Sequence, residues 1–275
     1  MRIGVSSFAF GWAVGAPASP DASAFSADTL LDFAVAHQVP VIQFGDNVPL
    51  QHCTVAELDA LAARARTAEI AIETGARGLT AEHLERSIMI SRRLDARVLR
   101  FVIDGAKGDP HYEPEFSDVI AIIRESVPAL RAANLTLGIE NHDRFPGAML
   151  RRLVENISSQ HVGICLDTAN SFGVGEGIGE VLRELAPVCV NLHMKDYIIE
   201  RLPWLMGFTV VGRSLGQGML PIDLVLDTVA SHGRCHTAVV ETWPPPEPEF
   251  AATLAKERLW AEESVVTLRA ALGRR

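Results

Sequence analysis

The sequence has few aromatic residues and no excess of basic residues. Aromatic residues make up 6% of the 275 residues, so Ala, Val, Leu and Ile supply most of the apolar mass. The formal net charge is -9 at pH 7. This charge argues against nonspecific nucleic-acid binding, because phosphate backbones require an excess of Lys and Arg. The negative net charge does not exclude a small anionic substrate that is bound by a local basic group.

Cysteines and long apolar runs are also scarce. Cys53, Cys165, Cys189 and Cys235 show no C-x-x-C spacing, and two of them fall within expected core strands, where a free thiol behaves as a small hydrophobe. Reduced thiols in a cytoplasmic protein are the simplest interpretation. No run approaches the roughly 20 apolar residues that span a bilayer. The stretch after Met1 is too short for the apolar region of a signal peptide, so we expect no membrane partner.

The sequence does contain a repeated alternation of short apolar strands and amphipathic helices. Strands are expected at 2–8, 40–44, 70–74, 97–103, 135–141, 162–167, 188–193 and 237–241. Helices are expected from Ser26, from Thr54, and at 80–94, 117–133, 147–156, 180–185, 221–232 and 249–272. Near-continuous apolar strands are typical of parallel sheets buried on both faces.

Eight strand–helix units predict an α/β fold, a (β/α)8 TIM barrel that spans residues 1–275 as one domain. A doubly wound open sheet is the alternative, but no G-x-G-x-x-G follows the first strand. Loops are expected at 11–23 and around Gly105, Gly108 and Pro110. The longest irregular segment is 197–220, and a structureless stretch of this length is usually functional.

Four consecutive strands end on side chains that bind metals. These are Glu140, Asp167, His193 and Glu241. The carboxyl ends of barrel strands form one face, so the four side chains are expected to converge. Burying three carboxylates together is costly unless a cation neutralises them. Oxygen ligands with one imidazole suit one divalent metal ion, Mn²⁺ in the first place, with Mg²⁺, Co²⁺ or Zn²⁺ as alternatives.

Further polar residues are expected on the same rim. His142 is a candidate general acid or base if the strand continues beyond Glu140, since strand side chains alternate, and otherwise it is a loop histidine. Lys195 could neutralise a carboxylate or phosphate, or form a Schiff base. Arg213, in the long irregular segment, could bind an anionic group.

Other residues near strand ends could line a substrate cup. They are Gln43, Glu73 and Arg100. Large apolar side chains in the predicted loops suggest a lid, a wall for sugar stacking or an oligomer contact. They are Trp12, Trp204, Met206, Phe208 and Trp243.

Several motifs together resemble those of the sugar phosphate isomerase/epimerase family, the xylose isomerase-like barrels of the AP endonuclease type 2 superfamily. The motifs lie mainly in the C-terminal half. They are Ile139-Glu140-Asn141-His142, Cys165-Leu166-Asp167-Thr168-Ala169-Asn170, Leu192-His193-Met194-Lys195-Asp196, Gly216-Gln217-Gly218 and Val240-Glu241-Thr242.

The resemblance implies a metal-dependent isomerase or epimerase. It implies a metal held by Glu140, Asp167, His193 and Glu241, and a ketose or oxo-sugar substrate converted through a metal-bound enediolate. Glu140 and Glu241 would serve as the acid/base pair. Barrels of this family are often dimers or tetramers, so a homo-oligomer is expected.

One position departs from the family pattern. Many relatives have a histidine three residues after the aspartate, where this chain has Asn170, so a site with three zinc ions is poorly supported and Asn170 becomes a candidate substrate-binding residue.

The segment 204–208 looks closer to branches that act on 3-oxo sugars. The alternative functions are therefore a decarboxylase of a 3-oxo sugar acid or a lyase of a C-glycoside, and a non-catalytic sugar-binding barrel.

Overall fold

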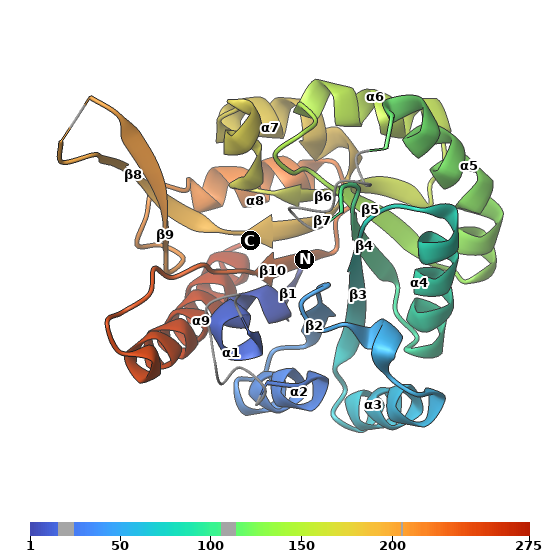
Figure 1. The fold of residues 1–275 in the computed structure, drawn as a ribbon, viewed down its shortest axis with the longest axis horizontal. Coiled ribbons are helices and arrows are strands. Elements are labelled where there is room, and N and C mark those ends of the chain that lie inside the picture. The colour runs from blue at the N-terminus through green and yellow to red at the C-terminus, as the bar shows by residue number, and fades with distance from the viewer. Residues whose placement is uncertain (16–24, 106–113, 205) are drawn as a thin grey trace.

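Eight parallel strands close into a barrel that is surrounded by helices (Figure 1). The computed structural model describes residues 1–15, 25–105, 114–204 and 206–275. The strand order around the barrel is β1-β10-β7-β6-β5-β4-β3-β2. The barrel strands are β1 (Arg2–Ser6), β2 (Val41–Phe44), β3 (Ala71–Arg77), β4 (Val98–Val102), β5 (Thr136–Glu140), β6 (Val162–Asp167), β7 (Cys189–Met194) and β10 (Thr237–Val240). The predicted (β/α)8 barrel is confirmed, and the doubly wound alternative is not formed.

The helices between the strands largely begin and end where the sequence predicts. They are α1 (Gly11–Val14), α2 (Ala27–Ala36), α3 (Val55–Thr67), α4 (Ala81–Arg93), α5 (Phe116–Ala132), α6 (Gly147–Ile157), α7 (Ile178–Leu185), α8 (Ile222–Ser231) and α9 (Phe250–Gly273). The capping box at the start of α3 is present, because the Thr54 hydroxyl accepts from the Glu57 amide at 3.3 Å and the Glu57 carboxylate accepts from the Thr54 amide at 2.7 Å. Among the described residues, no helix is both long enough and apolar enough to cross a bilayer.

The segment 197–220 was predicted to be structureless, and that prediction is wrong. Part of it forms an antiparallel hairpin of β8 (Asp196–Arg201) and β9 (Phe208–Arg213), with Asp196 opposite Arg213 and Arg201 opposite Phe208. The hairpin extends away from the barrel at the left of Figure 1. Both strands contain β-branched residues, which favour β structure, and a turn that includes Pro203 lies between them. The Pro and Gly residues of the segment led to the prediction of a loop in place of these strands.

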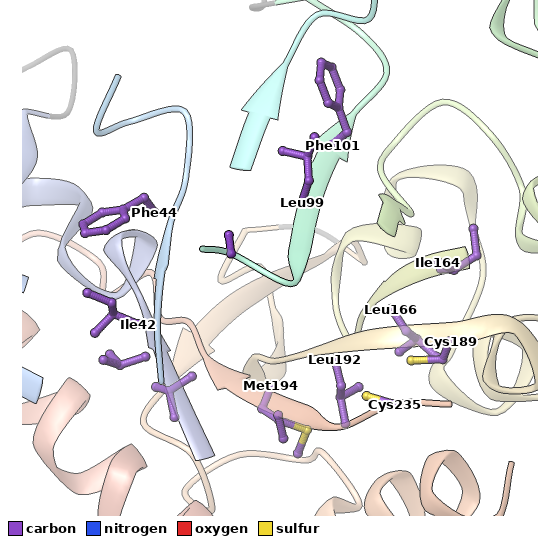
Figure 2. Packing of buried hydrophobic residues seen from close by; sticks show 14 of the residues in the cluster. Ile42, Phe44, Leu99, Phe101, Ile164, Leu166, Cys189, Leu192, Met194 and Cys235 are labelled. Atoms are coloured by element: carbon purple, nitrogen blue, oxygen red, sulfur yellow. The ribbon is translucent and has the colours of Figure 1, made fainter. Parts of the chain in front are cut away.

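Apolar and polar side chains alternate along β7 from Asn191 to Met194, and both kinds are buried. On β7, Leu192 and Met194 belong to the hydrophobic core, whereas Asn191 and His193 reach polar side chains from other strands inside the barrel. Figure 2 shows Leu192 and Met194, with Leu99 from β4, among the packed apolar side chains. Full burial of one such side chain contributes about 1.5–3 kcal/mol. The outward residues therefore stabilise the barrel, while the inward residues are available for chemistry.

The predicted first strand and the loop after it also differ in detail from the structure. β1 ends at Ser6, whose hydroxyl accepts from the Phe8 amide at 3.1 Å, and a 3₁₀ turn (Ser7–Phe10) follows. Residues 11–14 of the predicted loop form the short helix α1. The remainder of that loop from residue 16, together with Gly108 and Pro110 of the other predicted loop, lies outside the described residues.

A carboxylate from the last helix holds α1 against the barrel. Glu257 on α9 is 1% exposed and accepts from the amides of Trp12 at 2.7 Å and Ala13 at 3.0 Å. Burial raises the pKa of Glu257 to about 7, against the opposing effect of these two amides. Because the pKa in the folded state exceeds the usual 4.5, the folded protein binds this proton more tightly than the unfolded chain does.

The stability of the protein is therefore expected to decrease as the pH rises from about 4.5 to about 7, by at most about 3 kcal/mol from this group. In Glu257→Gln that part of the pH dependence should disappear. Urea unfolding at a series of pH values between 5 and 8 measures it, with the exposed Glu263→Gln on the same helix as control. Identical pH profiles for wild type and Glu257→Gln would refute the assignment.

Candidate metal centre and active site

Glu140, Asp167, His193 and Glu241 do converge. Glu140 ends β5, Asp167 ends β6 beside His193 of β7, and Glu241 directly follows β10. All four are at most 2% exposed. The Nδ1 atom of His193 lies 3.3 Å from Oε1 of Glu241 and 3.7 Å from a carboxylate oxygen of both Glu140 and Asp167. The imidazole nitrogen therefore faces three carboxylates that arrive from three other strands.

Two cationic side chains partly balance these carboxylates. Lys195 Nζ lies 2.8 Å from Asp167 Oδ2 and 3.0 Å from Glu241 Oε2. The guanidinium of Arg100 contacts Glu140 through Nε and lies 2.7 Å from Asp46 through Nη1. Three carboxylates against these two cations leave a net negative charge around His193, before the more distant Asp46 is counted.

The pKa values reflect this arrangement. Burial acts to raise the pKa of Asp167, but the Lys195 ammonium and His193 outweigh it, so the pKa is lowered. Burial acts to lower the pKa of His193, but the Glu241 and Glu140 carboxylates outweigh it, so the pKa is raised. The pKa of Glu241 is lowered, because His193 and Lys195 outweigh its burial. Asp167 and Glu241 are thus held ionised within a buried site.

The donor set fits a divalent cation. Asp167 Oδ2, His193 Nδ1 and both carboxylate oxygens of Glu241 are buried without a hydrogen-bond partner, although Asp167 Oδ2 and Glu241 Oε2 have Lys195 at ion-pair distance. Asp167, His193 and Glu241 each offer one ligand atom within 4.8 Å of the others. Unpaired buried polar atoms are costly unless something binds them. Oxygen and imidazole ligands of this kind suit Mn²⁺, Mg²⁺ or Zn²⁺.

A second grouping in the described chain combines Glu140 and His193 with Cys165. Burial raises the pKa of Cys165 well above its usual value, and its thiol donates to Asn191 Oδ1 at 3.3 Å. The protonated thiol is a poor metal ligand. The grouping with Asp167 and Glu241 is therefore the better metal site.

Three further candidate residues lie at this centre. Asn170 donates to Glu140 Oε1 at 2.8 Å and accepts from Lys195 Nζ at 3.3 Å. Arg100 contacts the other oxygen of Glu140. Asn170 and Lys195, with Phe8, Ala169, Phe172, Val210, Thr242 and Trp243, line an open cavity of about 330 Å³. The lining of this cavity is thus polar at Asn170, Lys195 and Thr242 and otherwise apolar.

The structure places the other predicted site residues elsewhere. β5 ends at Glu140, and His142 lies beyond it with Nδ1 2.5 Å from Asp143 Oδ1. Arg213 on β9 pairs with Glu200 at 2.8 Å. Glu73 is 3% exposed and lies in the barrel interior, where it contacts Gln43 and Asn191. Their suggested roles in catalysis and substrate binding remain predictions.

The large apolar residues predicted on the rim divide into two groups. Trp243 lines the cavity, and Trp12 lines a neighbouring hollow of about 450 Å³, where its indole donates to the Pro244 carbonyl at 2.9 Å. Trp204, Met206 and Phe208 belong to the hairpin, and their exposed fractions are 71%, 86% and 59%. The hairpin reaches the cavity through Val210.

Asp46 and Asn191 were missed as candidates, although the sequence carries a signal for each. Asp46 follows β2 by two residues, which is the same pattern of an acid after a strand that identifies Glu241. Asn191 lies two residues before His193 on β7, so strand alternation places both side chains on the inside.

The Gly216-Gln217-Gly218 motif forms a loop around a buried carboxylate. Asp196 Oδ2 accepts from the amides of Gly216 at 2.7 Å and Gly218 at 3.0 Å, and Oδ1 accepts from Leu220 at 2.9 Å and Tyr197 at 2.8 Å. A Cβ at Gly218 would lie 2.2 Å from Asp196 Oδ1, and Gly216 has φ +88°. Both positions therefore need glycine so that the loop can close on Asp196.

The chain belongs to the xylose isomerase-like TIM barrel family, whose sequence model matches residues 4–265. The resemblance inferred from the motifs is confirmed. A relative named 3-oxo-isoapionate decarboxylase, from Pectobacterium atrosepticum, is 31% identical over 265 residues, which are 96% of this chain and 94% of the relative.

Solved structures share the fold. D-psicose 3-epimerase, crystallised in the presence of D-fructose, has a TM-score of 0.74 at 14% identity and covers 99% of this chain and 100% of its own. A xylose isomerase-like TIM barrel protein from Mycobacterium smegmatis, in complex with magnesium, has a TM-score of 0.68 at 13% identity and covers 97% of each chain. These similarities establish the barrel, and the relatives with named activities are enzymes that act on small sugars or sugar derivatives.

Proposed function

We propose that the protein is a divalent-metal-dependent decarboxylase of a 3-oxo sugar acid. The observation that carries this proposal is an asymmetry between the two candidate acid/base groups. Both oxygens of Glu140 are engaged, one by Asn170 and the other by Arg100, whereas the carboxylate of Glu241 makes no hydrogen bond among the described residues and its Oε2 atom has an ion-pair partner, Lys195 at 3.0 Å. Epimerisation and isomerisation need one group to remove a proton and, in most schemes, a second to return it, while decarboxylation needs one proton delivered after carbon dioxide leaves.

The relative named as a decarboxylase supports the same reaction, because it aligns with almost the whole chain. Lys195 also supports it. Among the described residues that line the cavity, Lys195 is the one with a cationic side chain, and its ammonium could bind a substrate carboxylate. Trp243 and Phe8, on the apolar side of the cavity, would contact the carbon skeleton of the substrate and exclude water from it.

The roles of the residues follow from the chemistry. Asp167, His193 and Glu241, with Glu140, would hold the divalent ion, Mn²⁺ in the first place. Such an ion, when bound, polarises a carbonyl oxygen and stabilises negative charge that develops there. As the bond to the carboxylate carbon breaks, its electron pair moves toward the ketone to give an enolate, and carbon dioxide leaves. A proton then adds to the carbon that lost the carboxylate. Glu241 would take up this proton from solvent and transfer it to the carbon.

Isomerisation or epimerisation of a ketose is the second candidate. Three carboxylates surround His193, as the sequence motifs implied for such enzymes, and Glu140 and Glu241 would be the acid/base pair. That reaction would require Glu140 to leave Arg100 or Asn170 during turnover. A C-glycoside lyase and a sugar-binding barrel without catalysis are further alternatives.

Two substrates separate these functions. The purified protein is incubated with 3-oxo-isoapionate, and separately with D-psicose in deuterated water, with and without Mn²⁺ after treatment with EDTA. The proposal predicts that carbon dioxide is released from the oxo acid, that EDTA abolishes the release and that Mn²⁺ restores it. Deuterium incorporation and conversion of D-psicose without any carbon dioxide release would favour the epimerase. Binding without turnover of either class would favour the sugar-binding barrel.

A further inference from the structure

A connected group of buried polar side chains lies in the barrel interior next to the metal centre. Gln43 from β2, Glu73 from β3 and Asn191 from β7 are 1%, 3% and 0% exposed. None of them is among the four residues expected to bind the ion. Burying polar side chains destabilises the fold unless every donor and acceptor has a partner. This requirement fixes which atom donates in each hydrogen bond of the group.

Glu73 determines how the two amides are oriented. Its Oε2 atom accepts from Gln43 Nε2 at 3.0 Å and from Asn191 Nδ2 at 2.9 Å. Gln43 Nε2 also donates to Asn191 Oδ1 at 2.9 Å. An amide nitrogen only donates and a carboxyl oxygen can accept whether or not the other oxygen carries a proton. With its NH₂ group committed to Glu73 and Asn191, Gln43 must turn its oxygen the other way.

That oxygen faces His193. The Nε2 atom of His193 lies 2.6 Å from Gln43 Oε1. Because an amide oxygen can only accept, Nε2 must carry the hydrogen. In the neutral imidazole the other nitrogen, Nδ1, is then the one with a lone pair, and it is the atom that faces the carboxylates of Glu140, Asp167 and Glu241.

We infer that Glu73 is a positioning residue that acts through Gln43: it orients the Gln43 amide so that His193 keeps its hydrogen on Nε2 and offers Nδ1 to a divalent cation. Hydrogen-bond partners of this kind commonly fix the tautomer and ring orientation of a metal-binding histidine. The inference rests on the proposed metal site, and it replaces the substrate-binding role that the sequence suggested for Glu73.

The first test is the affinity for Mn²⁺ alone, measured by titration calorimetry. Gln43→Met and Glu73→Met each remove the directing group at similar volume and should weaken Mn²⁺ binding about 10–100-fold. Glu73→Gln keeps an acceptor oxygen and should stay near wild type. The double variant Gln43→Met/Glu73→Met should be no worse than Gln43→Met, because both residues act along one path.

Thr74→Val is the matched control. Thr74 is the next residue on β3, is equally buried and hydrogen-bonds to Ser91 at 2.6 Å. It has no contact with His193 among the described hydrogen bonds, so its loss should leave Mn²⁺ affinity unchanged. If Glu73→Met does not fold, Gln43→Met carries the same test.

The second test reads the tautomer directly and needs no metal. Nitrogen NMR of protein labelled at histidine, recorded at a pH high enough to keep the imidazole neutral and with His193→Gln used to assign the signal, should show hydrogen on Nε2 in the wild type and a mixture of tautomers in Gln43→Met. Unchanged Mn²⁺ affinity and an unchanged tautomer in Gln43→Met would overturn the inference. A wild-type protein that binds no divalent ion, yet shows the expected tautomer shift, would instead overturn the proposed function.

Discussion

Glu241→Gln is expected to lower kcat/KM about 10³-fold on the substrate that the protein turns over. Glu241 is 1% exposed, and its Oε1 atom lies 3.3 Å from His193 Nδ1 without a hydrogen-bond partner. The substitution removes a negative ligand from the proposed metal site and the group placed to transfer the proton. General acid or base catalysis alone contributes about 10²–10⁴-fold.

The experiment separates loss of binding from loss of chemistry. Steady-state kinetics are measured at increasing Mn²⁺ until the variant is saturated, and circular dichroism confirms that it folds. A residual defect of about 10²-fold or more at saturating Mn²⁺ identifies the proton transfer. Full recovery of activity at high Mn²⁺ would show that Glu241 only binds the ion. Glu155→Gln, an exposed carboxylate paired with Arg151, should behave as wild type.

Asp196→Asn is expected to reduce the free energy of unfolding by about 4 kcal/mol. The carboxylate is 1% exposed and accepts four backbone amides, two on each oxygen. Asparagine keeps the shape but turns an NH₂ group toward two of these amides, either those of Gly216 and Gly218 or those of Leu220 and Tyr197. Each lost hydrogen bond to a buried charged group costs about 1.5–3 kcal/mol, and the facing donors are left unsatisfied.

Urea unfolding measures this change, with Asp227→Asn as the control. Asp227 pairs with Arg275 on the surface, and its side chain is 66% exposed, so its loss should change stability by at most about 1 kcal/mol. The same loop follows β9, which supplies Val210 to the cavity, so Asp196→Asn should also raise KM. A variant as stable as the control would show that the loop does not depend on Asp196.

The four residues of the centre could be predicted because a simple rule relates sequence to position. Parallel barrel strands bring their carboxyl ends to one face, so an acid or a histidine that follows an apolar run lies on that face. The same rule would also have placed Asp46, two residues after β2, on this face, where its carboxylate pairs with Arg100. The rule is local, since it needs only the strand and the residue that ends it.

Other features depend on distances that the sequence does not contain. His142 was paired with Glu140 by strand alternation, but β5 stops at Glu140, so the alternation does not extend to it. Glu73 was expected in the substrate cup, and it lies in the barrel interior beside Gln43. The β8–β9 hairpin was missed because two strands that pair with each other, outside the barrel, lack the regular strand–helix rhythm.

The sequence by itself determined the eightfold alternation of strand and helix, the inward positions of Glu140, Asp167, His193 and Glu241, and the family. Periodicity and the ends of strands carry that information residue by residue. Only the tertiary structure decided which oxygens of Glu140 and Glu241 are engaged, and which nitrogen of His193 faces the carboxylates. Those depend on contacts such as His193 with Gln43, 150 positions apart in the chain, which form only when the barrel closes.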